Sequence, residues 1–344
     1  MASTAHDATP SPNYPACWIA GVRPTVKARF EVQPADISNA VLSASSSGRI
    51  LSGIPQTMVH FSNGVTRALV GADATQFATF LLDANVPTVV SRSTNEVWTW
   101  MLHEINGHRV SNEFIATNGP SVAYSILAEP VAPWVNNRGS IENAWETALS
   151  FIVSNACEGA TSEQAAVAQI TSFLFSGCGL VYDTYETKNA YSHLYSTRHG
   201  SLYLSDFIAR RSGFVVNCAD QALLLSAFSK LVGVDARAMV MSPFGYINES
   251  ALPSFPSCNN PLFSNPKYDS RSVCPVNSPT RSGFGHHMFV ESNGNVFDAC
   301  LGPHLGTETL SAYLLSTIDT ITTNTTFATG VSTNAHQFIL DWIE

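Results

Sequence analysis

Between Cys17 and Pro133 the chain alternates apolar and polar residues in short runs that are separated by turn signals. Runs such as VKARFEV, VWTWMLHEINGHRV and SVAYSIL have the period of two that is typical of half-buried strands. Asn63-Gly64 and Asn106-Gly107 lie where tight hairpins need residues that tolerate positive φ angles. This half of the chain is therefore predicted to be an antiparallel β domain, organised as a sandwich.

The pattern changes after residues 130–139, whose sequence PVAPWVNNRG indicates a linker. The segments SIENAWETALSFIVSNA and TSEQAAVAQITSFLFSG have apolar residues at helical spacing. In the second segment Thr161 or Ser162 is the expected cap, and the helix should end near Gly177. The predicted fold class is α+β, with three parts: a disordered tail at 1–16, the β domain at 17–134 and a domain of helices and strands at 138–344.

One cysteine stands at the start of a helix that should be buried. From Ala219 to Leu231 apolar residues occupy nearly every helical face. A buried cysteine such as Cys218 is often a small packing residue, and that interpretation stays open. A thiol in the first turn, however, faces the helix N–H groups and the positive end of the dipole, which favour the thiolate and can stabilise an oxyanion. Cys218 is therefore the best nucleophile candidate.

The hairpin HHMFVESNGNVFDAC supplies candidates for a base and for a residue that orients the base. Its turn is predicted at Ser292–Asn295, with Asn-Gly at the tip, so Glu291 should pair with Val296. Counting back along both strands places Asp298 opposite Phe289. The hairpin therefore brings a histidine-rich strand and an aspartate-bearing strand side by side.

Because strand faces alternate, His287 shares a face with Asp298 as its diagonal neighbour, and His286 points away. Diagonal neighbours are about 7–8 Å apart at Cα, within reach of an imidazole and a carboxylate. This register selects His287 as base and Asp298 as orienter, whereas a turn of three or five residues would reverse the choice. Alone, each residue has a purely structural explanation, but together with Cys218 they indicate a catalytic triad.

With these motifs the second half resembles the transglutaminase-like superfamily, the papain-related fold of transglutaminases, peptide N-glycanases and many microbial amidases and proteases. In RSGFVVNCADQALLLSAFSKLVGVDARAMVM, Gly and Cys precede the helix, and GVDAR is similar to the family's Gly-Ile-Pro-Ala-Arg. HMFVES is similar to its His-Ala-Trp-Val-Glu, and NVFDAC to its Asp-Pro ending. The resemblance extends over residues 174–303 and implies Cys218 as nucleophile, His287 as base and Asp298 as orienter.

The sequence departs from the family pattern in ways that indicate a divergent branch. Phe289 stands in place of the usual tryptophan, Asp235 in place of a proline, and Ala299 in place of the proline that follows the aspartate. No residue matches the family's remaining oxyanion donor plainly. Asn217 and His286 are the candidates for oxyanion or substrate binding, with an upstream Tyr or Gln as a further option.

Composition limits the partners. Lys and Arg number 17 against 26 acidic residues, and the net charge of −9 argues against nucleic acid and anionic membranes. No apolar run reaches the roughly 18 residues of a membrane span. The motif HEINGH is similar to His-Glu-x-x-His, but His103 and His108 are five residues apart around Asn-Gly, which predicts a hairpin. We expect no metal and no cofactor.

Charged residues are only 12%, and seven cysteines are present, an odd number that would leave one thiol unpaired in an oxidising compartment. Asn248 and Asn324 begin N-glycosylation motifs, while MASTAHDATPSPN is not a signal peptide. Secretion, with the signal removed, is favoured over a cytosolic location, which stays open.

An insert at 243–284, rich in Pro, Ser and Asn, is predicted to form a lid beside the site, clamped by a Cys258–Cys274 disulfide.

The leading hypothesis for function is acyl transfer or hydrolysis of an amide, ester or thioester, from a peptide or small molecule, through a Cys218 thioester. Two alternatives remain open. The triad could serve a non-acyl reaction such as isomerisation or cyclisation, or the fold could be a binding protein with a vestigial site. The oligomeric state is not indicated by the sequence.

Overall fold

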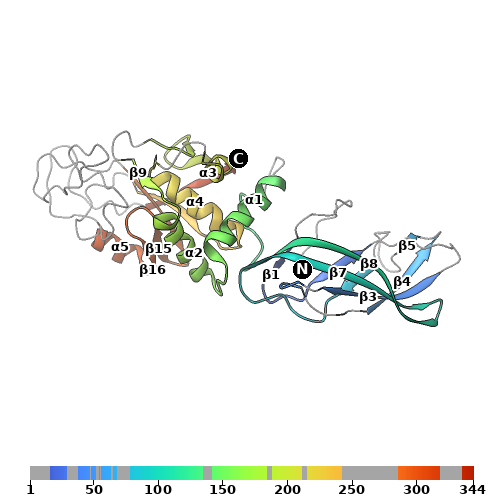
Figure 1. The fold of residues 1–344 in the computed structure, drawn as a ribbon. Coiled ribbons are helices and arrows are strands. Elements are labelled where there is room, and N and C mark those ends of the chain that lie inside the picture. The colour runs from blue at the N-terminus through green and yellow to red at the C-terminus, as the bar shows by residue number, and fades with distance from the viewer. Residues whose placement is uncertain are drawn as a thin grey trace, which may run out of the picture. The chain divides into compact units, whose positions relative to one another are not determined.

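The computed structural model describes residues 16–28, 38–46, 48–51, 54, 56–62, 65–67, 78–134, 142–183, 188–210, 215–241, 286–317 and 335–344. The chain divides into two compact units, Met1–Leu127 and Ala128–Glu344 (Figure 1). The fold is mixed α+β: the described part of the first unit consists of strands, and the described part of the second unit combines five α-helices with sheets. None of the helices in the described ranges is long and apolar enough to cross a membrane.

The first unit contains a six-stranded sheet with the order β1-β8-β7-β3-β4-β5. The strands are β1 (Ala16–Ile19), β3 (Asn39–Ser46), β4 (Gln56–Ser62), β5 (Val65–Arg67), β7 (Ser91–Ile105) and β8 (His108–Ile126). Asn106 and Gly107 connect β7 to β8 with φ angles of 47° and 81°, which confirms the predicted hairpin. His103 and His108 therefore lie on its two strands, and Asn63-Gly64 lies outside the described residues.

One pairing differs from the antiparallel prediction. Strand β1 runs parallel to β8, with Ala16 beside Ala123 and Ile19 beside Ile126. The reason is the path of the chain, which leaves β1 for another sheet and does not turn back beside β8. That second sheet consists of β2 (Thr25–Ala28) and β6 (Ala78–Leu81).

The two sheets of the first unit pack together through an apolar core. Phe80 of β6 is fully buried against Leu42 and Trp100 of the six-stranded sheet, and Val26 of β2 contacts the same cluster. The rings of Phe80 and Trp100 meet edge to face, with centroids 5.2 Å apart. Burial of such side chains from water is the main favourable contribution to the stability of this unit.

The described helices of the second unit are α1 (Glu142–Ile152), α2 (Glu163–Ser172), α3 (Leu204–Ile208), α4 (Cys218–Leu231) and α5 (Leu310–Thr317). Three of them, α1, α2 and α4, follow the predicted pattern, whereas α3 and α5 were not predicted. Ser162 is the cap of α2, since its hydroxyl accepts a hydrogen bond from the Ala165 N–H at 3.2 Å. Both α1 and α2 continue into a π-helical turn, Val153–Cys157 and Phe173–Gly177, so the second helical segment ends at Gly177 as predicted.

The largest sheet among the described strands of the second unit has five strands, in the order β16-β15-β14-β13-β17. Its strands are β13 (Arg237–Met241), β14 (His287–Ser292), β15 (Asn295–Asp298), β16 (His304–Thr309) and β17 (Ala335–Gln337). Two small sheets accompany it, formed by β9 (Val181–Tyr182) with β12 (Val215–Val216), and by β10 (Ser192–Leu194), β11 (His199–Leu202) and β18 (Ile339–Ile343).

Helix α4 is the buried core of the second unit (Figure 1). All of its residues except Lys230 are buried, which confirms the sequence prediction. It contacts α1 and α2 as well as strands β13 and β14, so apolar side chains are needed on every face. The chain after it turns at Gly233, whose φ is 93° and where a Cβ atom would lie 2.3 Å from the Ala128 carbonyl oxygen.

Gly306 and Gly294 make a matched pair for testing the packing beside β15. Both have positive φ angles, 75° and 81°, but a Cβ atom at Gly306 would lie 2.1 Å from the buried Phe297 ring, whereas nothing lies within 4 Å of one at Gly294. Gly294→Ala should lower the free energy of unfolding by about 1 kcal/mol through backbone strain. Gly306→Ala should lower it by about 3 kcal/mol, because overpacking is added. Urea unfolding measures both, and equal losses would contradict the packing argument.

Candidate functional site

Cys218 is the first residue of α4 and its side chain is buried, with 3% of the residue exposed. Asn217 is the helix cap: its Oδ1 accepts a hydrogen bond from the Asp220 N–H at 3.1 Å, and Asp220 Oδ2 accepts one from the Asn217 N–H at 3.2 Å. This reciprocal capping box fixes the direction in which the chain enters the helix. The thiol is therefore held at the positive end of the helix dipole.

The carboxylate of Asp220 ties the start of α4 to the segment before β10. Beyond the cap, it accepts hydrogen bonds from the Ala190 N–H at 2.8 Å, the Tyr191 N–H at 2.9 Å and the Ser192 hydroxyl at 2.7 Å. Burial raises the pKa of this carboxyl, and the surrounding donors act in the opposite direction. The position of Cys218 thus depends on a buried polar anchor as well as on apolar packing.

The hairpin β14–β15 has the register predicted from its turn. Glu291 pairs with Val296, and Asn293 and Gly294 form the tip with φ angles of 51° and 81°. His287 opens β14 and Asp298 closes β15. The two side chains consequently meet on one face of the sheet, as the alternation of strand faces requires.

His287 and Asp298 form a buried hydrogen bond, with 2.8 Å between Nε2 of the imidazole and Oδ2 of the carboxylate. The two side chains are 0% and 1% exposed. Burial acts to lower the pKa of His287, but the charge and hydrogen bond of Asp298, together with the Cys218 thiol, raise it to about 10. Burial likewise acts to raise the pKa of Asp298, and His287 and other neighbours lower it to about 2. The pair is therefore an imidazolium and a carboxylate near neutral pH.

Cys218 lies near the same imidazole. Its thiol is among the groups that raise the pKa of His287. Because Nε2 faces Asp298, Nδ1 is the ring nitrogen that remains for the sulfur. The structure thus brings together all three residues that the sequence singled out, from a helix start and two neighbouring strands.

The two other predicted site residues differ in their surroundings. Asn217 uses its side chain for the cap, and its Nδ2 also donates a hydrogen bond to Asn189 Oδ1. His286 directly precedes β14, and desolvation of its imidazole together with the neighbouring His287 lowers its pKa. The insert at 243–284, with Cys258 and Cys274, lies outside the described residues. Oxyanion and substrate binding by Asn217 and His286, and the lid, stay predictions.

Further residues around this site connect its parts. Gln221, one turn after Cys218, donates a hydrogen bond through Nε2 to the Ala299 carbonyl at 2.7 Å and so links α4 to the residue after Asp298. Cys300 lies in the bend after β15, and its N–H donates to Asp298 Oδ1. The Asn-x-x-Asp spacing at the start of α4 could have predicted the capping role of Asp220. No sequence pattern predicts the contact of Gln221 with Ala299, because the two residues are far apart in the chain.

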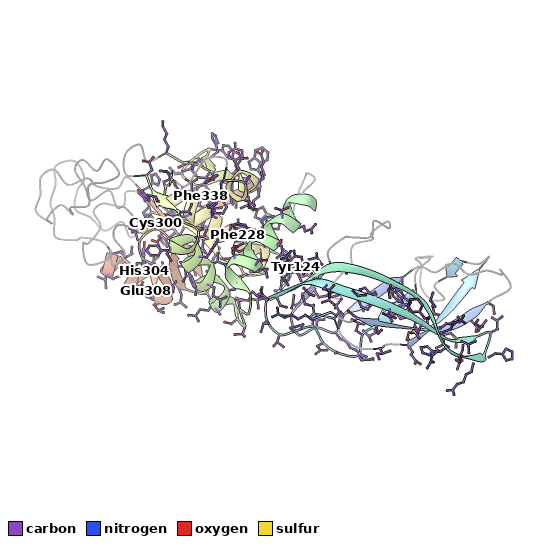
Figure 2. The ribbon with its side chains drawn as sticks, in the orientation of Figure 1. Tyr124, Phe228, Cys300, His304, Glu308 and Phe338 are labelled. Atoms are coloured by element: carbon purple, nitrogen blue, oxygen red, sulfur yellow. The ribbon has the colours of Figure 1, made fainter. Side chains whose placement is uncertain are left out.

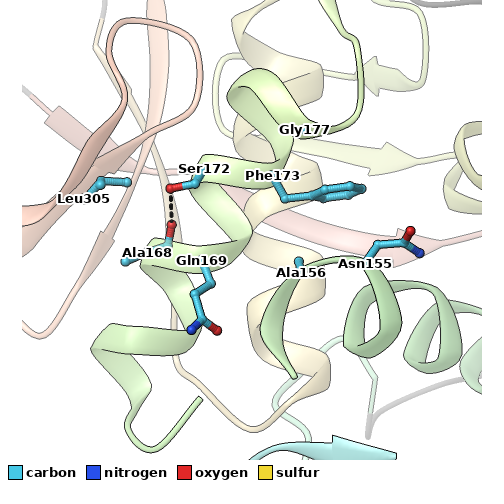
Figure 3. A pocket seen from close by; sticks show the side chains of 8 residues that line it. All are labelled: Asn155, Ala156, Ala168, Gln169, Ser172, Phe173, Gly177 and Leu305. Carbon is cyan, nitrogen blue, oxygen red and sulfur yellow. Dashed lines mark hydrogen bonds between the residues drawn. The ribbon is translucent and has the colours of Figure 1, made fainter. Parts of the chain in front are cut away.

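A separate hollow of about 530 Å³ lies elsewhere in the second unit (Figure 3). Its described lining comes from α2, β16 and the two π-helical turns: Asn155, Ala156, Ala168, Gln169, Ser172, Phe173, Gly177 and Leu305. The described lining includes no ionisable side chain, and its hydroxyl, that of Ser172, donates to the Ala168 carbonyl at 3.0 Å. Among the described residues there is also no group of three or more His, Cys, Asp or Glu side chains that could hold a metal ion.

No family model matches the chain, and no curated protein matches it in sequence. Among solved structures, the chain is similar to the crystal structure of red sea bream transglutaminase, with 12% sequence identity and a TM-score of 0.44. The match covers 90% of this chain and 55% of the transglutaminase, so the chain spans about half the length of that protein.

The His287–Asp298 pair should make stability depend on pH in the alkaline range. The pKa of His287 is 6.5 without the protein environment and about 10 within it, so its contribution is complete below pH 6.5 and disappears as the pH rises through 10. The difference in free energy of unfolding between the parent protein and His287→Gln should therefore shrink between pH 6.5 and 10. Urea unfolding followed by circular dichroism measures it, and a difference that stays constant up to pH 10 contradicts the pairing.

Replacing Asp220 should loosen the start of α4. In Asp220→Asn the amide NH₂ must face two of the four donors, whichever way it is turned. We expect a loss of about 3 kcal/mol in the free energy of unfolding. Asp341→Asn is the control, since Asp341 makes a half-exposed contact with His199 at 3.2 Å. The same small loss in both variants would contradict the anchoring role of Asp220.

Proposed function

We propose that the protein is a cysteine-dependent enzyme that transfers or hydrolyses an acyl group, with Cys218 as nucleophile, His287 as general base and acid, and Asp298 as the residue that orients the imidazole. The observation that carries this proposal is the buried contact chain from Cys218 through His287 to Asp298. Nucleophile, base and orienting carboxylate in hydrogen-bonding sequence are the requirements of covalent acyl chemistry.

In the first half of the reaction, the Cys218 sulfur forms a bond to the carbonyl carbon of an amide, ester or thioester. The imidazolium of His287 gives its Nδ1 proton to the leaving group as the bond to that group breaks. In the second half, water or an amine attacks the acyl thioester while His287 accepts its proton. The acyl group leaves on the new acceptor, and the Cys218–His287 pair returns to its starting state.

The start of α4 also offers a place for the developing negative charge on the carbonyl oxygen. The first N–H groups of an α-helix have no intrahelical acceptor, and the third of them in α4, that of Asp220, is already bound by Asn217. The N–H of Cys218 is left at the nucleophile itself, where an oxyanion would form. Asn217 and His286 are proposed to contact substrate or oxyanion next to it.

This proposal includes the finer fold assignment. We propose that residues 138–344 form a transglutaminase-like catalytic domain and that residues 17–134 form an accessory β domain of the sandwich type. The substrate is proposed to be a peptide or a small molecule with an activated or amide carbonyl. The support for this assignment is the order of Cys218, His287 and Asp298 along the chain and their contacts in the second unit.

The proposal is tested with a panel of p-nitrophenyl esters, thioesters and peptide amides, with and without an added amine. Turnover and an acyl adduct on Cys218, located by peptide mass spectrometry, are expected for the parent protein. Cys218→Ala and His287→Ala should lower the rate by about 10³-fold or more. Cys178→Ala is the matched control, because the Cys178 thiol is also buried and donates to the Leu174 carbonyl, at 3.5 Å.

Two results separate the alternatives. Unchanged turnover in Cys218→Ala would reject the thioester mechanism. Product carrying the added amine would show transfer, whereas release of the free acid alone would show hydrolysis.

A further inference from the structure

A second donor, a tyrosine hydroxyl, binds the oxygen of Asp298 that faces His287. The Tyr313 side chain reaches in from α5, and its hydroxyl donates to Asp298 Oδ2 at 2.6 Å. Tyr313 is fully buried, like His287. The other carboxylate oxygen, Oδ1, accepts the N–H groups of Cys300 at 2.7 Å and Leu301 at 3.0 Å. The carboxylate is thus held at both oxygens.

The Tyr313 ring is fixed on two sides. It packs against Phe289 with ring centroids 5.1 Å apart, and it meets the His304 ring edge to face at 4.8 Å. His304 is the residue opposite Asp298 in the β15–β16 pairing. The imidazole of His304 is in turn hydrogen-bonded through Nδ1 to Glu308 on the same strand (Figure 2). The tyrosine hydroxyl therefore has little freedom to leave the carboxylate.

We propose that Tyr313 is a positioning residue of the candidate site, which holds Asp298 Oδ2 toward His287, and that the His304–Glu308 pair holds Tyr313 in place. The inference rests on the proposed function of Cys218, His287 and Asp298. Rotation of the carboxylate would break the Tyr313 bond and both backbone bonds at once. The orientation of the Asp298 carboxylate that binds His287 is therefore also the one that accepts the hydrogen bonds of Tyr313 and the two backbone N–H groups.

The charged and titratable groups facing Asp298 come from each neighbouring element: His287 from β14, His304 from β16, Tyr313 from α5 and Cys300 from the bend after β15. Against the effect of burial, His287, the charge of His304 and the Tyr313 hydrogen bond all lower the pKa of Asp298. Burial and the Asp298 charge raise the pKa of Tyr313 well above its usual value, so its hydroxyl stays a donor. Loss of that donor should raise the pKa of Asp298.

The test is the titration of the Asp298 carboxyl, followed by carbon NMR of aspartate-labelled protein from pH 7 down to about pH 1.5, below the pKa of Asp298. In Tyr313→Phe, which keeps the ring, the midpoint of this titration should move up by about one pH unit, the tenfold change that one hydrogen bond to a charged group produces. Tyr124→Phe is the control, since Tyr124 is an equally buried tyrosine of the first unit. Iodoacetamide alkylation of Cys218, located by peptide mass spectrometry, tests the proposed function separately.

A loss of packing alone would lower stability and leave this midpoint unchanged. If Tyr313→Phe is folded and its profile superimposes on that of the parent, the inference is overturned. If Tyr313→Phe does not fold, His304→Gln provides the answer: an upward shift supports the inference, and an unchanged midpoint overturns it. If Cys218 of the parent protein reacts no faster than an ordinary thiol at any pH, the proposed function itself fails, and the inference fails with it.

Discussion

The hydrogen bond between His287 and Asp298 is the interaction on which the second unit depends most. Both side chains are removed from water, and a single buried ion without partners would cost several kcal/mol. The pair offsets that cost only because the remaining lone pairs of Asp298 are also occupied, by Tyr313 and by two backbone N–H groups. The bend after β15 and the placement of α5 are therefore requirements of the ion pair as well as features of the fold.

Helix α4 combines an apolar body with a polar start. Its body is apolar and contributes the core, while its start carries the polar residues Asn217, Asp220 and Gln221. The first two are hydrogen-bonded to the segment 189–190, and Gln221 is hydrogen-bonded to Ala299. Cys218, at this junction, is fixed by the apolar packing of the helix body and by the hydrogen bonds that cap the helix start. Burial of the helix and precise placement of the thiol are consequences of the same contacts.

The parts of the site that are local in sequence could be predicted, and the parts that are not local could not. Asn293-Gly294 fixes a two-residue turn, and the turn fixes the register, so the meeting of His287 with Asp298 follows from one hairpin. The buried character of α4 follows from its composition in the same way. Tyr313 reaches Asp298 from the next helix along the chain, beyond the bend at 299–302 and strand β16, and no spacing rule describes that path. The parallel pairing of β1 with β8 was missed for the same reason, because it joins residues about a hundred positions apart.

One of the departures from the pattern that the sequence resembles has a physical explanation in this structure. Phe289, where the resemblance leads one to expect tryptophan, stacks against the imidazole of His287 at 6.2 Å and against Tyr313 at 5.1 Å. An apolar ring between these two groups excludes water from the carboxylate that both of them bind, and the low local polarity strengthens each hydrogen bond in the cluster. The same low polarity raises the free-energy cost of any buried polar group that lacks its hydrogen bond, so the cluster is stable only when every hydrogen bond is formed. The stability of this part of the molecule and the alignment of Cys218, His287 and Asp298 are consequently set by one group of contacts.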